Sequence, residues 1–550
     1  MLQVALVFVA DVFQQVAVGI EAKVFGDENP VPWPDITGAV GPNHIVQLTN
    51  ARYSVFRKSD GALVQTSLLQ QFWRDAGLDV CPADFCAFDP RVLYDAFSQR
   101  WFASSANAFT TNAKHRKLLL AVSKSSDPTG GWSGFLVDTD PTDQGRPDFP
   151  VLGIDRDGIY IPMLMVSSLD LGKAIVVIPK ADLLAAIPTI ANASLFSITP
   201  PTDSFLMPIG NLDDLGLPFQ LFSHETASAS FNFFAITGAV RSPILNTTAG
   251  SVSLSSYPRP PDAAQPAAPT QKPPIACGTT FGSSTFRRNG VIWEVEGVGN
   301  GGRAALRWFK INAVTHVLLQ EGLVDDAQLS FYCASIAANE FGDVVIGFSG
   351  SSTTQFVSSY AVVGETDASG VTTFGKPLLL KAGADDFDNA SGRWGDFSAT
   401  VVDPSNPLHF WTFQEWVSAD DTWSTQITEL IVARREIDVA IDIKPGIPPN
   451  SINPAAKGVI PVAILTTATF DATTVDPISV RFGATGTEGI PVHAALEDVD
   501  RDGDTDMILQ FDSRTTGIRC GDTLAWLTGE TRAGQAVRGS DSINTVGCRK

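Results

Sequence analysis

Residues 497–511, EDVDRDGDTDMILQF, place side-chain carboxylates at a spacing that could hold a metal ion. The loop contains five aspartates: Asp498, Asp500, Asp502, Asp504 and Asp506. A D-x-D-x-D-G-x-x-D pattern offers carboxylates at its first, third, fifth and ninth positions and a backbone carbonyl at its seventh, and Gly503 permits the sharp turn. Ca²⁺ takes about six to eight oxygen ligands in flexible geometry. The spacing therefore predicts a Ca²⁺ site.

The loop differs from an EF-hand in two ways. Leu509 occupies the twelfth position, where an EF-hand has a bidentate glutamate, and the following residues MILQF read as a strand instead of a helix. We therefore expect a calcium loop on a β scaffold, with an affinity of about 10⁻⁴–10⁻³ M, as in extracellular sites. The alternative is a solvated acidic turn. Catalysis by this loop is disfavoured because a calcium-saturated carboxylate is a poor general base.

A second set of acids could act on glycosidic bonds. The candidates lie in the strongest strand motifs of the chain: Asp89, Asp148, Asp396 and Glu415. A glycoside hydrolase needs two carboxyl groups about 5–10 Å apart, so this role requires that two of the four converge. The chain contains no H-E-x-x-H, G-x-S-x-G or G-x-x-x-x-G-K-[ST] motif, and its histidines are scattered. The sequence therefore leans against an enzyme, with a glycoside hydrolase or lyase as the enzymatic alternative.

The elements that would position these acids are mostly strands. Between residues 31 and 436 an apolar strand, a polar turn and an aromatic-rich strand recur at a spacing of roughly 45–70 residues, which suits four-stranded propeller blades. Seven blades are favoured, with six or eight as alternatives. Helical periodicity is limited to short segments at 67–77 and 179–190. We therefore expect an all-β protein built on a β-propeller.

The two ends of the chain differ from the propeller region in their sequence pattern. From residue 437 to 550 the sequence shows clean period-two strands, which predict a compact β-sandwich that carries the calcium loop. Residues 1–30 form a poorly defined segment or the remainder of an export signal, since LQVALVFVA is apolar but no basic residue precedes it. Outside this segment no run of eighteen apolar residues predicts a transmembrane helix.

Charge and cysteine content restrict the partners and the compartment. The chain has 38 basic and 59 acidic residues, a formal net charge of −21, which disfavours nucleic acid and anionic membranes. Six cysteines without a C-x-x-C pair indicate disulfides in an oxidising compartment, so we expect a secreted or cell-surface protein. Pairing by neighbourhood is the simplest arrangement, although the sequence leaves the connectivity open: Cys81–Cys86, Cys277–Cys333 and Cys520–Cys548.

Longer motifs carry two resemblances. IDIKPG, NSINPAAKGVIPVAIL, DVDRDGDTDMILQF and GIRCGDTLAWLTGET resemble a C-terminal module of many secreted bacterial proteins, over residues 438–550. This resemblance supports the calcium site and the Cys520–Cys548 pair and implies no catalytic activity. DITGAVGPNHIVQLTN, DPRVLYDAFSQRWF and RWGDFSATVVDPSNPLHFWTFQEW resemble secreted bacterial β-propeller proteins described as sialidase-like. SSDPTGGW, residues 125–132, is a degenerate form of the turn that sialidases carry, and no tyrosine can be assigned as a nucleophile.

Three functions follow as hypotheses. The leading one is a non-catalytic propeller for extracellular recognition or attachment, with glycan or matrix as its partner and a structural Ca²⁺ ion in the C-terminal domain. The second is an extracellular glycoside hydrolase or lyase that uses the acids at the propeller mouth. The third is a structural component of an extracellular assembly, which calcium-dependent self-association would distinguish from the first.

Overall fold

The structure is a computed structural model, and it describes most of the chain from residue 34 to 548. Between these limits the undescribed residues are 81–85, 108–114, 168–170, 199–204, 212, 214–215, 225–228, 267–275, 278–284, 368, 388–392, 434–435 and 533–534. Of the first 33 residues only the backbone of two strands, β1 (Ala5–Val9) and β2 (Val12–Ala22), is described. The larger of two compact units ends at Val432 and the smaller continues from Ala433. No helix in the described part of the chain is long and apolar enough to cross a membrane.

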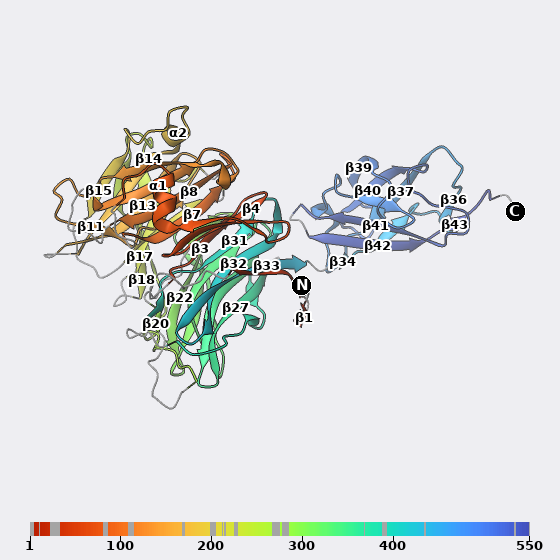
Figure 1. Cartoon of the computed structure of the whole chain (residues 1–550). Helices are drawn as coiled ribbons and strands as arrows, with labels where there is room; N and C mark the ends of the chain where they lie inside the picture. Colours follow the sequence, from red (N-terminus) through yellow and green to blue (C-terminus); the bar gives the residue numbers. More distant parts are fainter. Residues whose placement is uncertain are drawn as a thin grey trace. The chain divides into compact units, whose positions relative to one another are not determined.

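The larger unit is a β-propeller with seven antiparallel meanders among the described residues (Figure 1). Blade 1 is β3 (Thr37–Val40), β4 (His44–Leu48), β5 (Arg52–Arg57) and β6 (Leu63–Leu68). Blade 2 is β7 (Ala87–Asp95), β8 (Arg100–Asn107), β9 (Lys117–Ser123) and β10 (Trp132–Val137). Blade 3 is β11 (Arg146–Asp148), β12 (Gly153–Ile154), β13 (Gly158–Val166), β14 (Leu171–Pro179) and β15 (Ser194–Ile198).

The remaining blades repeat this pattern. Blade 4 is β16 (Leu206–Asn211), β17 (Phe219–His224), β18 (Ser230–Thr237) and β19 (Ile244–Ser253), and blade 5 is β21 (Thr285–Arg288), β22 (Val291–Asn300), β23 (Arg303–Asn312) and β24 (Leu318–Val324). Blade 6 is β25 (Ser330–Ala338), β26 (Asp343–Ser352), β27 (Gln355–Thr366), β28 (Thr372–Phe374) and β29 (Leu378–Lys381). Blade 7 is β31 (Ala399–Asp403), β32 (Asn406–Ala419) and β33 (Thr422–Ala433), with β2 beside β33 in the same sheet.

The first strand of each blade, continued in blade 3 by β12, is its innermost strand, and most of these strands contact the next one around the ring. β25 contacts β31, β31 contacts β3, and β3 contacts β7, so the last blade meets the first. Figure 1 labels β3 and β31 at this junction. Between blades 4 and 5 the innermost strands β16 and β21 pair directly and run parallel. All innermost strands therefore begin at one end of the ring. We call this end the entry end, and the opposite end, where each innermost strand turns back, the turn end.

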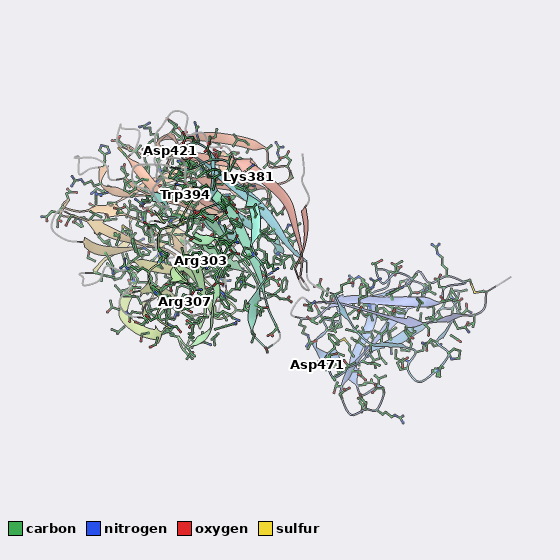
Figure 2. The ribbon with its side chains drawn as sticks, turned by 90° about the horizontal axis from the view of Figure 1, so that it is seen from below. Arg303, Arg307, Lys381, Trp394, Asp421 and Asp471 are labelled. Carbon is green, nitrogen blue, oxygen red and sulfur yellow. A yellow bond between two sulfur atoms is a disulfide. The ribbon has the colours of Figure 1, made fainter. Side chains whose placement is uncertain are left out.

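Apolar residues fill the spaces between neighbouring blades. One core joins blades 1 and 2 around Trp73 and Trp101, and another joins blades 5 and 6 around Phe331 and Phe348. Trp394, which is labelled in Figure 2, lies fully buried in a core with residues of blades 6 and 7. Alternating strand residues thus face the two adjacent blades, as period-two patterning requires.

Helices are short and few among the described residues. The two expected helical segments are confirmed only as α1 (Leu69–Asp75) and α2 (Lys180–Leu183), with 3-10 turns η2 (Pro128–Gly130) and η3 (Ala472–Thr474) elsewhere. A small parallel pair joins β20 (Ala276–Cys277) and β30 (Arg393–Gly395). α2 is a single turn whose Leu183 packs on blade 3. The helix ends there because the residues that follow are largely exposed, with Ile187 at 85% exposure.

The smaller unit consists of two four-stranded sheets and a short parallel pair. One sheet has the order β34 (Ile437–Asp438), β42 (Ala536–Ser542), β41 (Leu524–Glu530), β38 (Arg481–Gly483), and the other β35 (Ile441–Ile443), β37 (Val459–Ile464), β40 (Asp506–Asp512), β39 (Pro491–Glu497). The pair is β36 (Ser451–Ile452) with β43 (Asn544–Thr545). Both sheets contribute to one apolar core that includes Val462, Phe482, Leu509 and Leu527. The unit is therefore a β-sandwich.

Disulfides occur in both units. Cys520 and Cys548 form the bond that the sequence resemblance implied, with a Cα–Cα distance of 5.8 Å. Cys86 and Cys333 are also disulfide-bonded. The predicted pairings with Cys81 and Cys277 fall outside the residues whose side chains are described, and they stay predictions.

Candidate functional site

Buried carboxylates gather at the entry end of the propeller, where the innermost strands of blades 7, 1 and 2 begin. Asp35, Asp89 and Asp396 each offer a carboxylate oxygen that lies within 4.8 Å of the other two. We call these three residues, together with Glu415, the acid cluster. All four are at most 5% exposed. The cluster thus brings together acids that are far apart in the sequence and that belong to three different blades.

The backbone directs two of these side chains inward. Asp35 and Asp89 have φ values of 45° and 50°, in the left-handed region that aspartate tolerates better than most residues. In blade 2 this conformation coincides with a register shift between Phe88 and Arg91, which is a bulge at the start of the innermost strand. Cys333 of blade 6 repeats both features, with a φ of 52° and a shift between Tyr332 and Ser335. A bulge at the start of the innermost strand therefore occurs in blades 2 and 6, at the entry end.

The acids and one amide link neighbouring blades by hydrogen bonds. The Asp35 Oδ1 atom accepts from the Asp396 backbone N–H at 2.8 Å, and its Oδ2 atom accepts from Asn50 Nδ2 at 2.6 Å. Asn50 Oδ1 accepts from the Asp89 N–H at 2.8 Å, and Asp89 Oδ2 accepts from the Phe149 N–H at 2.9 Å. These contacts join blades 7, 1, 2 and 3 in sequence around the ring.

Glu415 extends this chain of contacts on the blade 7 side. Its Oε1 atom accepts from the Ile36 N–H at 3.3 Å, one residue after Asp35. A Cβ atom on Gly395, one residue before Asp396, would lie 2.9 Å from Glu415 Oε2. The Glu415 carboxylate therefore lies close to the backbone next to two members of the acid cluster. Its Oε2 atom is buried and has no hydrogen-bond partner in the described part of the chain.

Burial makes ionisation of these acids costly. Desolvation, together with the neighbouring Asp396 carboxylate, raises the pKa of Asp35 to about 7. Desolvation followed by the charges of Asp35 and Asp148 holds the pKa of Asp89 well above its usual range. Desolvation also raises the pKa of Glu415, with a further contribution from Asp35. Each of these three carboxyl groups is therefore harder to ionise than it would be in water, because the fold buries them close to one another.

Two arginines partly balance the acid cluster. Arg393 forms an ion pair with Asp396. Arg91 is buried, and its guanidinium carbon lies 3.4 Å from the centroid of the Phe397 ring, a cation–π contact. Burial lowers the pKa of Arg91 to about 10, which still leaves it charged at neutral pH. The arginines hold the aromatic and acidic groups of adjacent blades together.

The structure brings together three of the four acids predicted from the sequence. Asp89, Asp396 and Glu415 belong to the acid cluster, whereas Asp148 lies at its edge, with a side chain 29% exposed and an ion pair of 3.7 Å to Arg146. Asp35 was missed. Its signal was available in the sequence, because PDITGAV places an aspartate at the start of a strand much as FDPRVLYD does.

The predicted calcium loop lies between β39 and β40 of the sandwich. Oxygens of Asp498, Asp500 and Asp506 lie within 4.8 Å of one another. Asp506 is buried and accepts the Thr466 N–H at 2.8 Å and the Val499 N–H at 2.9 Å, which fixes its orientation. These contacts leave a partly exposed group of three carboxylates.

Two further aspartates of this loop make local contacts. Asp502 Oδ1 accepts the Asp504 N–H at 3.1 Å, so this carboxylate turns toward its own backbone. Desolvation and the adjacent carboxylates, first among them Asp502, raise the pKa of Asp504 to about 6. Gly503 has a φ of 103°, which glycine adopts without strain. The predicted turn is therefore present, with three of the five acids close together.

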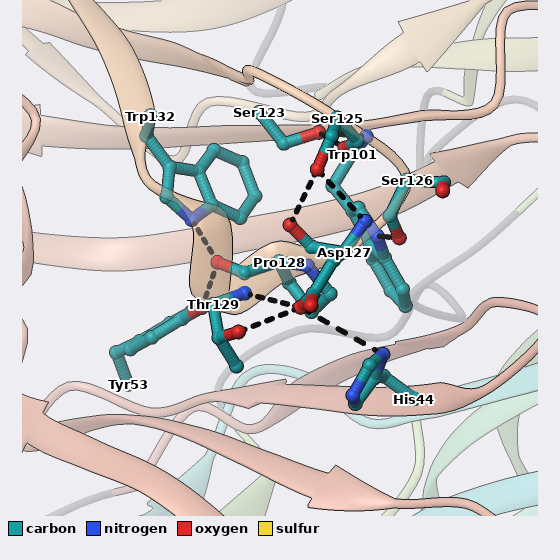
Figure 3. Close-up of polar contacts among 10 residues, drawn as sticks. All are labelled: His44, Tyr53, Trp101, Ser123, Ser125, Ser126, Asp127, Pro128, Thr129 and Trp132. Atoms are coloured by element: carbon teal, nitrogen blue, oxygen red, sulfur yellow. Dashed lines mark hydrogen bonds and ion pairs between the residues drawn. The ribbon is translucent and has the colours of Figure 1, made fainter.

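The degenerate sialidase-type turn at 125–132 stabilises the junction of blades 1 and 2 (Figure 3). The Pro128 carbonyl accepts from Tyr53 Oη of blade 1 and from Trp132 Nε1, each at 3.0 Å. Asp127 Oδ1 accepts from the Thr129 N–H at 2.9 Å and lies 3.9 Å from His44 Nδ1. These contacts are internal to the fold, so the turn has a structural role.

Comparison with known proteins adds distant structural neighbours. No family model and no curated protein matches the chain. The WD40 domain of Toxoplasma gondii coronin aligns with a TM-score of 0.36 at 8% identity, over 78% of this chain and 89% of that one. The α-L-arabinofuranosidase Arb93A of Fusarium graminearum gives 0.34 at 10% identity over 63% and 93%. Trypanosoma rangeli sialidase gives 0.32 at 10% identity over 68% and 55%. At these values the comparisons carry no conclusion about activity or ligand, and the propeller assignment rests on the strand topology described above.

Proposed function

We propose that the chain is a secreted or cell-surface recognition protein whose propeller binds glycan or matrix without catalysing a reaction. The observation that carries this proposal is the internal use of the candidate catalytic acids. Asp35, Asp89 and Glu415 each accept a backbone N–H of an adjacent blade and are closed off from solvent. A general acid or nucleophile must reach the substrate, whereas these carboxylates are committed to holding blades together. Disulfides in both units support an oxidising compartment.

The second candidate is an extracellular glycoside hydrolase, and a specific observation favours it. The carboxylate oxygens of the acid cluster approach one another within 4.8 Å, near the roughly 5 Å that separates the two acids of retaining enzymes. A raised pKa, as burial gives Asp35, is also what a general acid requires. Rearrangement that admits a sugar to the entry end would be needed for this activity.

A glycan array read in two ways distinguishes these candidates. The full chain is applied with calcium, and both retained protein and loss of each glycan are measured. We expect retention on a subset of glycans and no loss, because the acids are closed off from substrate. Glycan loss that disappears in Asp89→Asn but persists in Asp127→Asn, an acid in an exposed turn, would contradict the non-catalytic proposal. If the protein is neither retained on any glycan or matrix polymer nor degrades one, a structural role would be favoured instead.

We further propose that the sandwich loop holds a structural Ca²⁺ ion through Asp498, Asp500 and Asp506. The support is the proximity of these carboxylates and the crowding of negative charge in the loop. Two of them are exposed, which suits a site that fills from millimolar external calcium. The ion would offset part of the negative charge of the loop and join the ends of β39 and β40.

Removal of calcium should destabilise the sandwich. In about 10 mM calcium, roughly 100 times a Kd of about 10⁻⁴ M, the ion stabilises the folded state by about 2.7 kcal/mol, which corresponds to about 10 °C in the melting temperature of a domain of this size. We therefore expect excess chelator to lower the melting transition of the sandwich by about 10 °C in calorimetry. The variant Asp498→Asn/Asp500→Asn should melt at the same temperature with and without chelator. An unchanged wild-type transition in excess chelator would rule out a stabilising ion.

A further inference from the structure

We propose that the acid cluster of the propeller is a second divalent-cation site, which takes Ca²⁺ between blades 7, 1 and 2. This site is separate from the sandwich loop and lies in the other unit of the chain. Its ligands would be carboxylate oxygens of Asp35, Asp89 and Asp396, with Glu415 as a fourth acid beside them. A cation here would stabilise the junction at which the last blade of the ring meets the first.

The balance of buried charge points to a divalent ion. Among the residues that the structure describes, four buried carboxylates, those of the acid cluster, lie near two arginines, Arg91 and Arg393. Ionised acids would leave an excess of two negative charges, which is the charge that one divalent cation supplies. An uncompensated carboxylate in a protein interior is costly, so the excess must be met by a cation or by bound protons.

Glu415 supplies a second observation that is independent of the close group of three. Its side chain is 98% buried, since its exposed fraction is 2%, and its Oε2 atom has no hydrogen-bond partner within the described residues. Its other oxygen accepts the Ile36 N–H, and Oε2 lies beside Gly395, so the carboxylate is directed at the segments that carry Asp35 and Asp396. A buried acceptor without a donor loses its hydration without replacement. A nearby cation, or water that the cation holds, would satisfy it.

The spacing and chemistry of the oxygens suit a hard cation. Three oxygens within 4.8 Å of one another can surround an ion at roughly the 2.3–2.6 Å distance of Ca²⁺ after small adjustments. Their existing hydrogen bonds leave capacity, because each carboxylate oxygen has two lone pairs. The set contains no histidine or cysteine, which favours Ca²⁺ over Zn²⁺. The left-handed backbone at Asp35 and Asp89, with the hydrogen bonds of their carboxylates to neighbouring blades, positions two of the ligands.

The test counts bound ions in the full chain with the sandwich loop disabled. Calcium is removed from wild-type protein and from Asp498→Asn/Asp500→Asn, and Ca²⁺ binding is then measured by titration calorimetry and by equilibrium dialysis with metal analysis. We expect two ions per wild-type chain and one ion in the loop variant. The propeller sequence is untouched in this variant, so misfolding of the propeller cannot imitate a negative result.

The outcomes separate this inference from the calcium site of the proposed function. The propeller site would be overturned if the loop variant binds no Ca²⁺ while the wild-type chain binds one or two ions. One ion in both proteins would support the propeller site and contradict the sandwich site. No ion in either protein would overturn both, and the acid cluster would then be balanced by protons.

Single substitutions then assign the ligands. In the loop-variant background Glu415→Gln and Asp89→Asn should each weaken the remaining Ca²⁺ affinity at least tenfold. Asp127→Asn is the matched control, because Asp127 is an exposed acid of the same propeller at its turn end. Equal losses in the control and in Asp89→Asn would contradict the assignment. Circular dichroism of each variant checks that the propeller is folded.

Discussion

Replacement of Trp101 by alanine is expected to lower the free energy of unfolding of the propeller by about 3–5 kcal/mol. Trp101 is fully buried between blades 1 and 2, where its ring centroid lies 4.9 Å from that of Tyr94. Its Nε1 donates to the Ser126 carbonyl at 2.9 Å, and a Cβ on Gly41 would lie 2.6 Å from the ring. The substitution therefore leaves a cavity and an unsatisfied carbonyl in a tightly filled junction.

Calorimetry of the full chain measures this effect, because it can separate the propeller transition from that of the sandwich. Ile187→Ala is the control, since this side chain is 85% exposed and its loss should change stability by less than about 0.5 kcal/mol. A Trp101→Ala transition that coincides with the wild-type transition would show that the junction repacks without loss.

The second large effect concerns pH and is expected in blade 5. Burial raises the pKa of Glu296 to about 7, although Arg307 lowers it and Glu321 raises it again. Arg307 is labelled in Figure 2. Its Nη1 atom lies 3.4 Å from Glu296 Oε1, and its Nη2 atom forms a closer ion pair with Glu321 Oε2. Between pH 4.5 and 7 the folded protein binds a proton at Glu296 that the unfolded chain does not. Stability from this group therefore falls as the pH rises through this window.

Glu296→Gln should remove that dependence. A shift from 4.5 to about 7 corresponds to about 3 kcal/mol, so the variant should be more stable than wild type by up to this amount at pH 8 and equal to it near pH 4. Glu321→Gln is the matched control on the same arginine. The Glu321 carboxylate has a lowered pKa, since hydrogen bonds from Ser255 and Arg307 outweigh its desolvation, so its loss should destabilise the propeller at neutral pH. Denaturant unfolding between pH 4 and 8 gives both curves, and a Glu296→Gln curve parallel to wild type would contradict the assignment.

The sequence predicted the architecture better than the site. Period-two strands, turn residues and the recurring hairpins were sufficient for a propeller followed by a sandwich, because each blade repeats the same local pattern. Three acids of the acid cluster, Asp89, Asp396 and Glu415, were also identified from blade motifs. Their convergence could not be derived, since it depends on ring closure, which brings Asp35 and Asp396 together across 361 positions of sequence. The role of Asn50 as a bridge between two acids likewise depends on how blades 1 and 2 pack.

In the sandwich loop, by contrast, the location of the site could be predicted from the sequence alone. Its residues are adjacent in sequence, so the spacing alone located the turn at Gly503 and the group that contains Asp498 and Asp500. Asp502 and Asp504 lie outside the close group of three, and their predicted participation in the ligand set, with Asp504 acting through its backbone carbonyl, stays a prediction. The Asp502 carboxylate accepts an N–H of its own loop. Short-range motifs thus give the location of a site, whereas the orientation of each side chain depends on backbone contacts.

The two ends of the propeller hold their blades by different chemistry. At the turn end, Lys58 pairs with Asp403 at 2.6 Å and Lys180 with Asp95 at 2.8 Å, so each charge has an opposite partner in a neighbouring blade. At the entry end the carboxylates of Asp35 and Asp89 meet backbone amides and one another. The ring is therefore electrostatically polar, with ion pairs of opposite charge at one end and a buried group of like charges at the other. At the junction where the last blade meets the first, a change of pH is therefore expected to act through the entry end, where burial raises the pKa values of Asp35 and Asp89.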